Sequence, residues 1–309
     1  MREKITAIIA STLLFINVIF WCSLLFMLTP IKFILPEIVV RKVMDPIFSA
    51  IASAWISCNS GWMKLTQGTL WDIEIPDNLN PKGWYFVSAN HQSWVDILVL
   101  QHVLNGKIPF LKFFLKQELI RVPIMGQAWW ALDFPFMKRF SKSYLKKHPE
   151  MKGKDIETTQ NACKKFKYIP TSVMNFFEGT RFTPEKHVKQ QPPYKHLLNP
   201  KSGGFAFALN AMGDKFQSLL DCTIVYPEGI PSFADFMHGK IPKIIVRIRE
   251  VPIPADFCHG DYENDAEFKH QFQSWVSDIW KQKDKEIDDL YKQECLIEDN
   301  QAQAGHLNY

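Results

Sequence analysis

Two short blocks of the sequence carry side chains that can move a proton or hold an anion. The first block is Ser88-Ala-Asn-His-Gln-Ser-Trp-Val-Asp96, in which His91 and Asp96 are five residues apart. A carboxylate bonded to one imidazole nitrogen fixes the tautomer and leaves the other nitrogen free as a base. We therefore predict His91 and Asp96 as catalytic residues, the orienting half of a triad to which no nucleophilic serine is assigned.

The spacing restricts where these two side chains can lie. On one continuous helix, five residues place them about 140° apart around the axis, where they cannot meet. A buried strand over Trp84–Ser88 and a helix over Ser93–Leu104 instead place His91 in the turn and Asp96 in the first helical turn. The same residues also fit a capping box of Ser93 and Asp96, so the sequence alone leaves both interpretations open.

The second block, Phe176-Phe-Glu-Gly-Thr-Arg181, follows another predicted strand, Thr171–Phe177. Ligand sites of α/β sheets collect at strand ends. Gly179 permits a tight turn, and Arg181 offers a planar fork for phosphate. We predict Glu178, Gly179, Thr180 and Arg181 as substrate-binding residues. The alternative is a surface ion pair between Glu178 and Arg181, which would contribute less than ~1 kcal/mol.

Positive charge is concentrated between Lys107 and Lys154. This tract holds eleven Lys/Arg against three Asp/Glu, a balance of +8, whereas the remaining residues balance at −4. Phosphate head groups, an anionic membrane surface, a phosphorylated cofactor or nucleic acid would suit such a tract. Lys116 and Arg139 are its candidate phosphate ligands, with a solvated basic face as the alternative. Nucleic acid is disfavoured, because no recognisable binding module accompanies the tract.

The elements that must position these blocks follow from hydrophobic periodicity. Mostly continuous apolar runs alternate with helical stretches, which predicts an α/β domain with a mostly parallel sheet flanked by helices. The predicted strands are Leu70–Ile75, Trp84–Ser88, Thr171–Phe177, Leu219–Tyr226 and Lys243–Ile248, and the predicted helices are Ser93–Leu104, Asp155–Phe166 and Gly204–Met212. A long amphipathic helix ends the chain, with apolar residues at helical spacing from Phe268 to Tyr291.

The amino terminus has the composition of a membrane anchor. The run from Ile5 to Thr29 has 25 residues without a charge, and ~20 apolar residues suffice to cross the hydrocarbon core. It is too long for a signal-peptide core and lacks a cleavage site, so we predict an uncleaved anchor. Pro46–Leu65 suits a helix lying in one leaflet, and whether the anchor spans is open. We predict an anchor over residues 1–65 and an α/β domain over 66–309.

Composition excludes several classes of protein. Among 309 residues, 47% are hydrophobic, 22% are charged and 14% are aromatic, which is incompatible with a disordered chain. Six cysteines are scattered singly, which fits a reducing compartment and neither a disulfide scaffold nor a zinc site. No G-x-S-x-G, G-x-x-x-x-G-K-[ST], H-E-x-x-H or G-x-G-x-x-G motif occurs. Serine lipases of the α/β-hydrolase type, P-loop enzymes, zincins and Rossmann dehydrogenases therefore lose their main support.

Four blocks in order resemble the glycerolipid acyltransferase family, of the 1-acylglycerol-3-phosphate acyltransferase type. They are Asn90–Asp96, Lys116–Arg139, Glu178–Arg181 and Thr223-Ile-Val-Tyr-Pro227, within roughly residues 70 to 230. The stretches WALDFPFMKR, GKDIETT and NFFEGTRFT look closest to a bacterial branch related to the lysocardiolipin acyltransferases. In the second block Arg139 follows Phe-Met-Lys instead of the commoner Phe-Ile-x-Arg, so the acceptor preference stays open.

The resemblance implies a mechanism that agrees with the residue types. His91, oriented by Asp96, takes the proton from a lysophospholipid hydroxyl, which attacks the thioester of acyl-CoA or acyl carrier protein without an acyl-enzyme. Arg181, Lys116 and Arg139 hold the acceptor phosphate, while Glu178 and Thr180 shape the pocket. It implies no bound cofactor or metal, since acyl-CoA or acyl carrier protein serves as donor.

The implied location is a bacterial inner membrane with the catalytic domain on the cytoplasmic side, where both acyl donors occur. The partners are then membrane phospholipid or lysophospholipid, without nucleic acid, and the oligomeric state is undetermined. Two other functions remain open from the sequence. One is a non-catalytic module that binds anionic lipid through the basic tract, and the other is an acyl thioester hydrolase in which water replaces the lipid hydroxyl.

Overall fold

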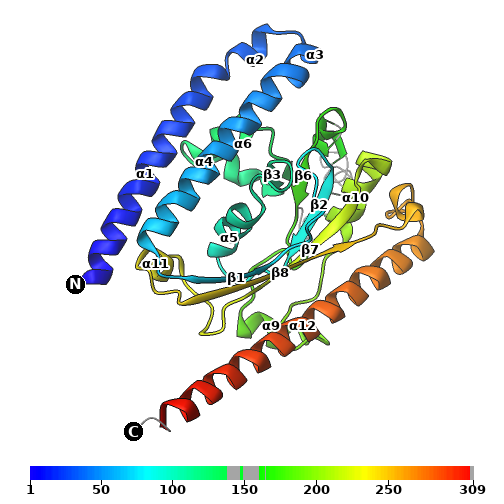
Figure 1. The fold of residues 1–309 in the computed structure, drawn as a ribbon. Helices are drawn as coiled ribbons and strands as arrows, with labels where there is room; N and C mark the ends of the chain where they lie inside the picture. Colours follow the sequence, from blue (N-terminus) through cyan, green and yellow to red (C-terminus); the bar gives the residue numbers. More distant parts are fainter. Residues whose placement is uncertain (138–146, 149–159, 164, 307–309) are drawn as a thin grey trace.

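The computed structural model describes residues 1–137, 147–148, 160–163 and 165–306. Its centre is a six-stranded sheet with helices on both faces (Figure 1). The strand order is β1-β8-β7-β2-β6-β3, with β1 at Leu70–Glu74, β2 at Tyr85–Ala89, β3 at Leu111–Phe113, β6 at Ser172–Met174, β7 at Ser218–Val225 and β8 at Lys243–Val251. The predicted α/β architecture, a mostly parallel sheet between helices, is confirmed.

The strands that precede the candidate site are all parallel to one another. β7, β2, β6 and β3 run in one direction, whereas β8 is antiparallel to β7 and β1 is parallel to β8. A second sheet pairs β4 (Leu115–Lys116) with β5 (Phe136–Met137) in parallel. The carboxyl ends of β2 and β6 therefore lie at the same edge, which is where a parallel sheet collects its functional residues.

All five predicted strands form, with shifted ends. β6 stops at Met174, short of the predicted Phe177, because the chain turns after Asn175, whose backbone N–H still bonds the Val87 carbonyl at 3.0 Å. β8 continues to Val251, beyond the predicted Ile248. β3, β4 and β5 were not predicted, since two or three residues are too few to show a period.

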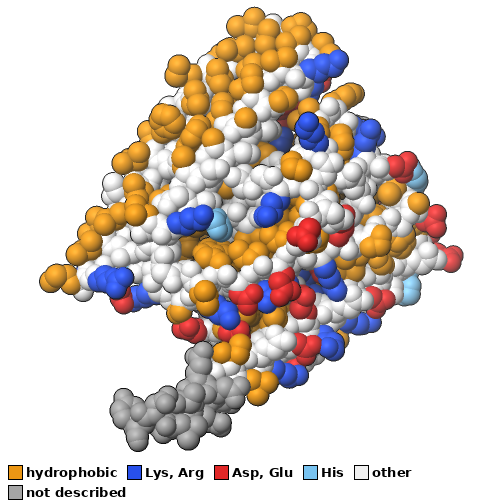
Figure 2. Space-filling view, in the orientation of Figure 1, with side chains coloured by type: hydrophobic (Ala, Val, Ile, Leu, Met, Phe, Trp, Pro, Cys, Tyr) orange, Lys and Arg blue, Asp and Glu red, His pale blue; other side chains and the backbone are white. Residues whose placement is uncertain are grey.

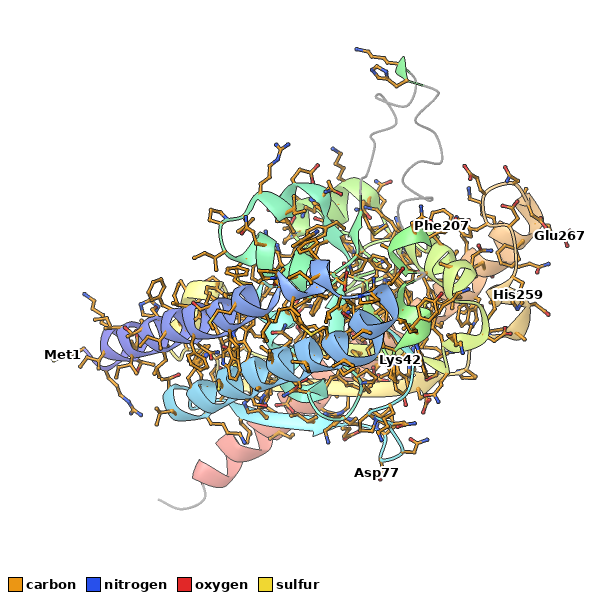
Figure 3. The ribbon with its side chains drawn as sticks, turned by 90° about the horizontal axis from the view of Figure 1, so that it is seen from above. Met1, Lys42, Asp77, Phe207, His259 and Glu267 are labelled. Carbon is orange, nitrogen blue, oxygen red and sulfur yellow. The ribbon has the colours of Figure 1, made fainter. Side chains whose placement is uncertain are left out.

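The first 66 residues fold into a pair of long antiparallel helices, α1 (Arg2–Leu28) and α4 (Asp45–Thr66) (Figures 1 and 3). Between them lie α2 (Ile31–Ile34), α3 (Glu37–Val39) and a π-helical turn, η1 (Val40–Met44). Prolines at positions 30 and 36 interrupt this connection because proline cannot continue a helical hydrogen-bond ladder. Among the described residues, one helix, Arg2–Ile34, is long and apolar enough to cross a membrane.

Both ends of α1 are bonded to the rest of the protein. Near its start, Glu3 forms an ion pair of 3.1 Å with Lys240. Beyond its end, the Lys32 ammonium lies 3.0 Å from the carboxylates of both Asp133 and Asp45. Figure 3 shows Met1 and Lys42 at opposite ends of this helical pair. The pair therefore lies along the domain over its whole length.

The remaining helices divide between the two faces of the sheet (Figure 1). Tyr85 and Val87 of β2 face the core shared with α1, α4, α5 (Val95–Leu104), α6 (Met125–Ala131) and α11 (Phe233–Met237). Phe86 points the other way, into the core shared with α10 (Gly203–Met212) and α12 (Ala266–His306). The short elements are α9 (Pro184–Gln190), η2 (Gln117–Arg121), η4 (Lys165–Tyr168), η5 (Gly213–Lys215) and η6 (Ala255–Cys258).

The predicted helices fare differently. Ser93–Leu104 and Gly204–Met212 correspond to α5 and α10, and the long C-terminal helix forms as α12. Most of the predicted Asp155–Phe166 helix lies outside the described residues, although residues 160–163 are helical. All six cysteines are free thiols. The predicted boundary between residues 65 and 66 stays a prediction, with α4 ending at Thr66 and β1 starting at Leu70.

Candidate active site

The turn after β2 is held against the neighbouring strand by one side chain. The Asn90 amide donates to the Ile224 carbonyl and accepts from the Ile224 N–H, both at 2.8 Å. Asn90 thus pairs with the backbone of β7 as a further strand residue would, while the chain itself turns away. The next residue, His91, is thereby placed at the carboxyl edge of the sheet.

His91 and Asp96 meet as the spacing predicts. The His91 Nδ1 lies 2.9 Å from Asp96 Oδ2, with the carboxylate fully buried. The same oxygen accepts the backbone N–H groups of Gln92 at 2.7 Å and Ser93 at 2.8 Å. Asp96 therefore binds the turn before α5 and orients the imidazole at once. The capping box is only half formed, because the Ser93 hydroxyl bonds the Pro231 carbonyl and the Val95 N–H instead of the Asp96 N–H.

Tyr226 completes the environment of this carboxylate. Its hydroxyl donates to Asp96 Oδ1 at 2.7 Å, so both oxygens of Asp96 have partners. Burial, with the Asp96 charge adding to it, raises the pKa of Tyr226 well above its ordinary value, which keeps the hydroxyl a donor. Tyr226 belongs to the fourth sequence block, but that block gave no sign of this contact.

The His91 ring is fixed on its face as well as at its edge. It stacks on Phe176 with ring centroids 3.8 Å apart and planes 12° apart. The side chain is 13% exposed, and no group in the described part of the chain hydrogen-bonds its Nε2. With Nδ1 donating to Asp96, the hydrogen-bond network assigns the free lone pair to Nε2. The arrangement provides one oriented base on a partly exposed ring.

Glu178 binds this turn from the second sequence block. Its buried carboxyl group accepts the His91 backbone N–H at 2.7 Å and the Leu198 backbone N–H at 3.1 Å. Burial raises the pKa of Glu178 to about 8, although these two N–H groups act in the opposite direction. Its predicted role in substrate binding stays a prediction, and the geometry gives it a hold on the backbone of His91.

The rest of the second block turns back over the histidine. Gly179 has φ +66°, a conformation that favours glycine, and the Phe182 N–H donates to the His91 carbonyl at 2.7 Å. Lys186 of α9 supports the turn by donating to the Thr180 hydroxyl at 2.8 Å and the Arg181 carbonyl at 2.7 Å. The histidine turn and the second block are thus one hydrogen-bonded unit.

Arg181 points outward and does not pair with Glu178. Its guanidinium carbon lies 4.8 Å from the ring centre of Trp94, which is exposed at the start of α5. The surface ion pair considered from the sequence is therefore absent, since Glu178 is turned inward. A guanidinium laid on an aromatic face keeps its hydrogen-bond donors available for an anion.

The remaining candidates from the sequence are two basic residues, Lys116 and Arg139. Lys116 lies on β4 with its side chain exposed, opposite Met137 of β5 in the strand register. Arg139 lies outside the described residues. Their predicted roles as phosphate ligands remain predictions.

Comparison with known proteins confirms the family that the sequence resembles. A family model named Acyltransferase matches residues 71–230, just over half of the chain. The chain belongs to the Acyltransferase family. The matched segment contains every predicted site residue.

Two relatives illustrate the similarity. The chain is 26% identical over 250 residues to 1-acyl-sn-glycerol-3-phosphate acyltransferase gamma of Mus musculus, covering 76% of this chain and 61% of that protein. It is 24% identical over 219 residues to the delta enzyme of Homo sapiens, covering 67% and 53%. The match therefore spans between about half and three fifths of these relatives.

A solved structure shares the fold of this member of the Acyltransferase family. The crystal structure of the 1-acyl-sn-glycerophosphate (LPA) acyltransferase PlsC from Thermotoga maritima superposes with a TM-score of 0.53. The alignment covers 93% of this chain and 98% of that one at 17% identity. At that identity the likeness concerns the arrangement of helices and strands.

Proposed function

We propose that the protein is an O-acyltransferase acting on lipids. It moves a fatty acyl chain from acyl-CoA or acyl carrier protein to the free hydroxyl of a lysophospholipid such as lysophosphatidic acid. The observation that carries this proposal is the His91–Asp96 pair at 2.9 Å, on a partly exposed ring, in a chain of the Acyltransferase family. The names of the relatives support the choice of acceptor.

The proton is moved by His91 alone in this mechanism. Nε2 takes the proton of the acceptor hydroxyl as its oxygen attacks the thioester carbonyl, and the imidazolium then returns that proton to the departing thiolate. Asp96 holds the ring in the required tautomer and stabilises its charge. Direct transfer is favoured over an acyl-enzyme, because the buried Ser93 hydroxyl is engaged with the Pro231 carbonyl at 2.6 Å.

The acceptor phosphate is assigned to the basic groups near the turn. Arg181, spread over Trp94, presents donors at the outer side of the second block. Lys116 and Arg139 would contribute further positive charge from the basic tract. In this proposal Glu178, Gly179 and Thr180 shape the base of the pocket, with Glu178 acting through the backbone of His91.

We propose further that α1 and α4 hold the protein in one leaflet of a bacterial inner membrane, with the catalytic domain on the cytoplasmic side. Their outer faces expose large apolar side chains, among them Phe15, Phe20, Met27 and Ile47. Hydrophobic side chains dominate this side of the molecule in Figure 2. Insertion in one leaflet is preferred to spanning, because both ends of α1 are bonded to the same domain.

The test is thiol release from palmitoyl-CoA or oleoyl-CoA by the full chain in membranes, with mass spectrometry of the lipid products. The acceptors are lysophosphatidic acid, monolysocardiolipin and other lysophospholipids, offered singly. His91→Ala should lower turnover by roughly 10²–10⁴-fold, as expected for loss of a general base. The matched control is His102→Ala, which removes a histidine of α5 that bonds Ser60 at 2.7 Å instead.

Each other result has a defined meaning. Thiol release without an acceptor would identify a thioester hydrolase. Absence of turnover with every acyl-CoA would move the assay to acyl carrier protein as donor. Absence of turnover with that donor too, combined with salt-sensitive binding to anionic vesicles that ignores His91→Ala, would refute the proposal in favour of a lipid-binding module.

A further inference from the structure

The C-terminal helix α12 lies outside the matched segment, yet it reaches the candidate site. Trp280, Asp284 and Asp288 are spaced four residues apart, so they form one stripe along the helix. The stripe faces the chain between α9 and α10. Beside the fully buried Trp280, Asp284 and Asp288 place two half-buried carboxylates on this stripe.

The stripe binds that connecting chain through its backbone. The Asp284 carboxylate accepts the N–H groups of Lys195 at 2.8 Å and His196 at 2.7 Å. One turn earlier, the buried Trp280 indole donates to the Leu198 carbonyl at 3.0 Å. Asp288 adds contacts to the side chains of Lys195 at 2.5 Å and His196 at 3.2 Å. Residues 195–198 are therefore held to α12 by several independent bonds.

Leu198 is the link from this contact to the histidine. Its N–H donates to one oxygen of Glu178, and the other oxygen accepts the N–H of His91. Trp280 also contacts the residue before Glu178, because its ring lies 5.6 Å from that of Phe177. From Trp280 to His91, the path is a continuous run of hydrogen bonds through Leu198 and Glu178.

A neighbouring side of α12 is bonded to the sheet, so the helix is a firm support. Fully buried Lys283 forms an ion pair of 2.8 Å with Asp221 of β7, and its ammonium also donates to the Thr223 hydroxyl at 3.2 Å. Glu286 accepts from the same hydroxyl at 2.6 Å. β7 also carries Cys222, which pairs in register with Ala89 at the end of β2.

We propose that Trp280 and Asp284 are positioning residues for the reaction. By holding residues 195–198, they set the position of Glu178, and Glu178 sets the backbone of His91. The effect on turnover rests on the proposed function, whereas the effect on the His91 turn does not. The candidate active site is therefore completed by a helix that the matched segment does not include.

The experiment compares Trp280→Phe with Trp275→Phe in the full chain. The first substitution removes the indole donor but keeps an aromatic ring, and the second alters a half-buried tryptophan one turn away. Two quantities are measured: kcat and KM for both substrates, and hydrogen exchange of the peptide covering residues 87–94. Trp280→Phe should lower kcat about tenfold or more with KM unchanged, and speed exchange in that peptide at least severalfold.

A second pair of variants guards against general loss of folding. Asp284→Asn leaves one amide oxygen as acceptor for two N–H donors. Asp278→Asn alters an exposed aspartate on the same helix, paired with Lys281 at 2.8 Å. Asp284→Asn should act in the same direction as Trp280→Phe, and Asp278→Asn should have no effect. Exchange in the strands β1 and β8 should not change in any variant.

The outcomes separate the two proposals. Unchanged exchange at residues 87–94 in both Trp280→Phe and Asp284→Asn would overturn the positioning role, whatever the turnover. The same holds if exchange rises equally throughout the sheet, as a merely structural role predicts. Faster local exchange in a protein that transfers no acyl group would retain the link to His91 and reject the transferase.

Discussion

Helices α1 and α12 both run along the outside of one sheet, but they distribute polar side chains in opposite ways. α1 buries Asn17 against α4 and exposes large apolar side chains such as Phe15 and Phe20. α12 buries an apolar face that includes the ammonium of Lys283, and its outer face carries both acidic and basic residues. In Figure 2, orange side chains cover the α1–α4 side, whereas blue and red alternate along α12.

The difference teaches which part of each interface is specific. On α1 and α4, the faces in mutual contact and the outer faces are both apolar. A few polar bonds, such as Asn17 to Asn59 at 2.7 Å, therefore determine how the two helices are aligned. Between α12 and the sheet, hydrophobic burial drives association, and the buried charges select one register. Four substitutions would test this comparison.

The largest effect is expected at the buried charge of α12. Lys283→Ala would leave Asp221 fully buried with Arg249 as its remaining ionic partner, at 2.7 Å. Removing one member of a buried ion pair costs about 3–5 kcal/mol of unfolding free energy. Denaturant unfolding of the protein in detergent would measure it.

The matched control for that variant is Lys285→Ala, which breaks an exposed pair with Asp289 at 2.6 Å. Its cost should be less than ~1 kcal/mol. Equal costs for the two variants would show that the buried position of Lys283 contributes nothing, and the comparison between the helices would lose its basis.

The second effect concerns the outer faces. Phe20 on α1 and Leu296 on α12 are 61% and 62% exposed, so exposure alone does not distinguish them. If α1 meets hydrocarbon and α12 meets water, Phe20→Ser should weaken partitioning by about 2 kcal/mol, roughly thirtyfold, whereas Leu296→Ser should not. Co-sedimentation with vesicles of phosphatidylethanolamine and phosphatidylglycerol measures both, and an equal response would remove the distinction.

Much of this architecture follows from local sequence patterns. The change from a continuous apolar run to helical spacing placed the turn between β2 and α5, and with it the contact of His91 and Asp96. The uncharged run of α1 and the periodic apolar residues of α12 likewise predicted two long helices. Such features depend only on residues close together in the sequence, which is why they can be predicted from sequence alone.

The remaining features depend on contacts between distant residues. Tyr226 reaches Asp96 only because β7 lies beside β2. Trp280 reaches Leu198 only because α12 packs beside the chain that connects α9 and α10. The antiparallel direction of β8 has no signature in its apolar run. The turn at Gly179 likewise directs Glu178 inward and Arg181 outward, which the residue types alone do not indicate.

A third, smaller effect is expected between α1 and α4. Asn17 donates to Asn59 at 2.7 Å and to the Trp55 carbonyl at 3.2 Å. Asn17→Ala should lower stability by about 1–2 kcal/mol, the usual value of a polar contact between helices in an apolar environment. Thermal unfolding in vesicles measures this, with exposed Ser11→Ala on the same helix as control. No difference between the two would mean that apolar packing alone aligns the pair.

The smallest effect concerns pH. The Asn17–Asn59 contact does not titrate, whereas the site supported by α12 contains a titratable group, Glu178. The Glu178 carboxyl is held in the fold with a pKa of about 8, chiefly by burial, with Asp96 raising it and Lys283 lowering it. Between about pH 4.5 and about 8, the folded protein therefore holds one proton more than the unfolded chain at this group. Its contribution to stability is complete below about 4.5 and is lost as pH rises through about 8.

Replacing the carboxyl should remove that dependence. The unfolding free energy of the wild type minus that of Glu178→Gln should decrease as pH rises across this window, by at most about 1.4 kcal/mol per pH unit. Urea unfolding at several pH values measures it. The corresponding difference for Asn17→Ala should stay flat. A flat difference for Glu178→Gln would mean that the N–H groups of His91 and Leu198 outweigh burial and keep the carboxylate ionised. Its hydrogen bonds to the turn at His91 would then be stronger than those of a neutral carboxyl group.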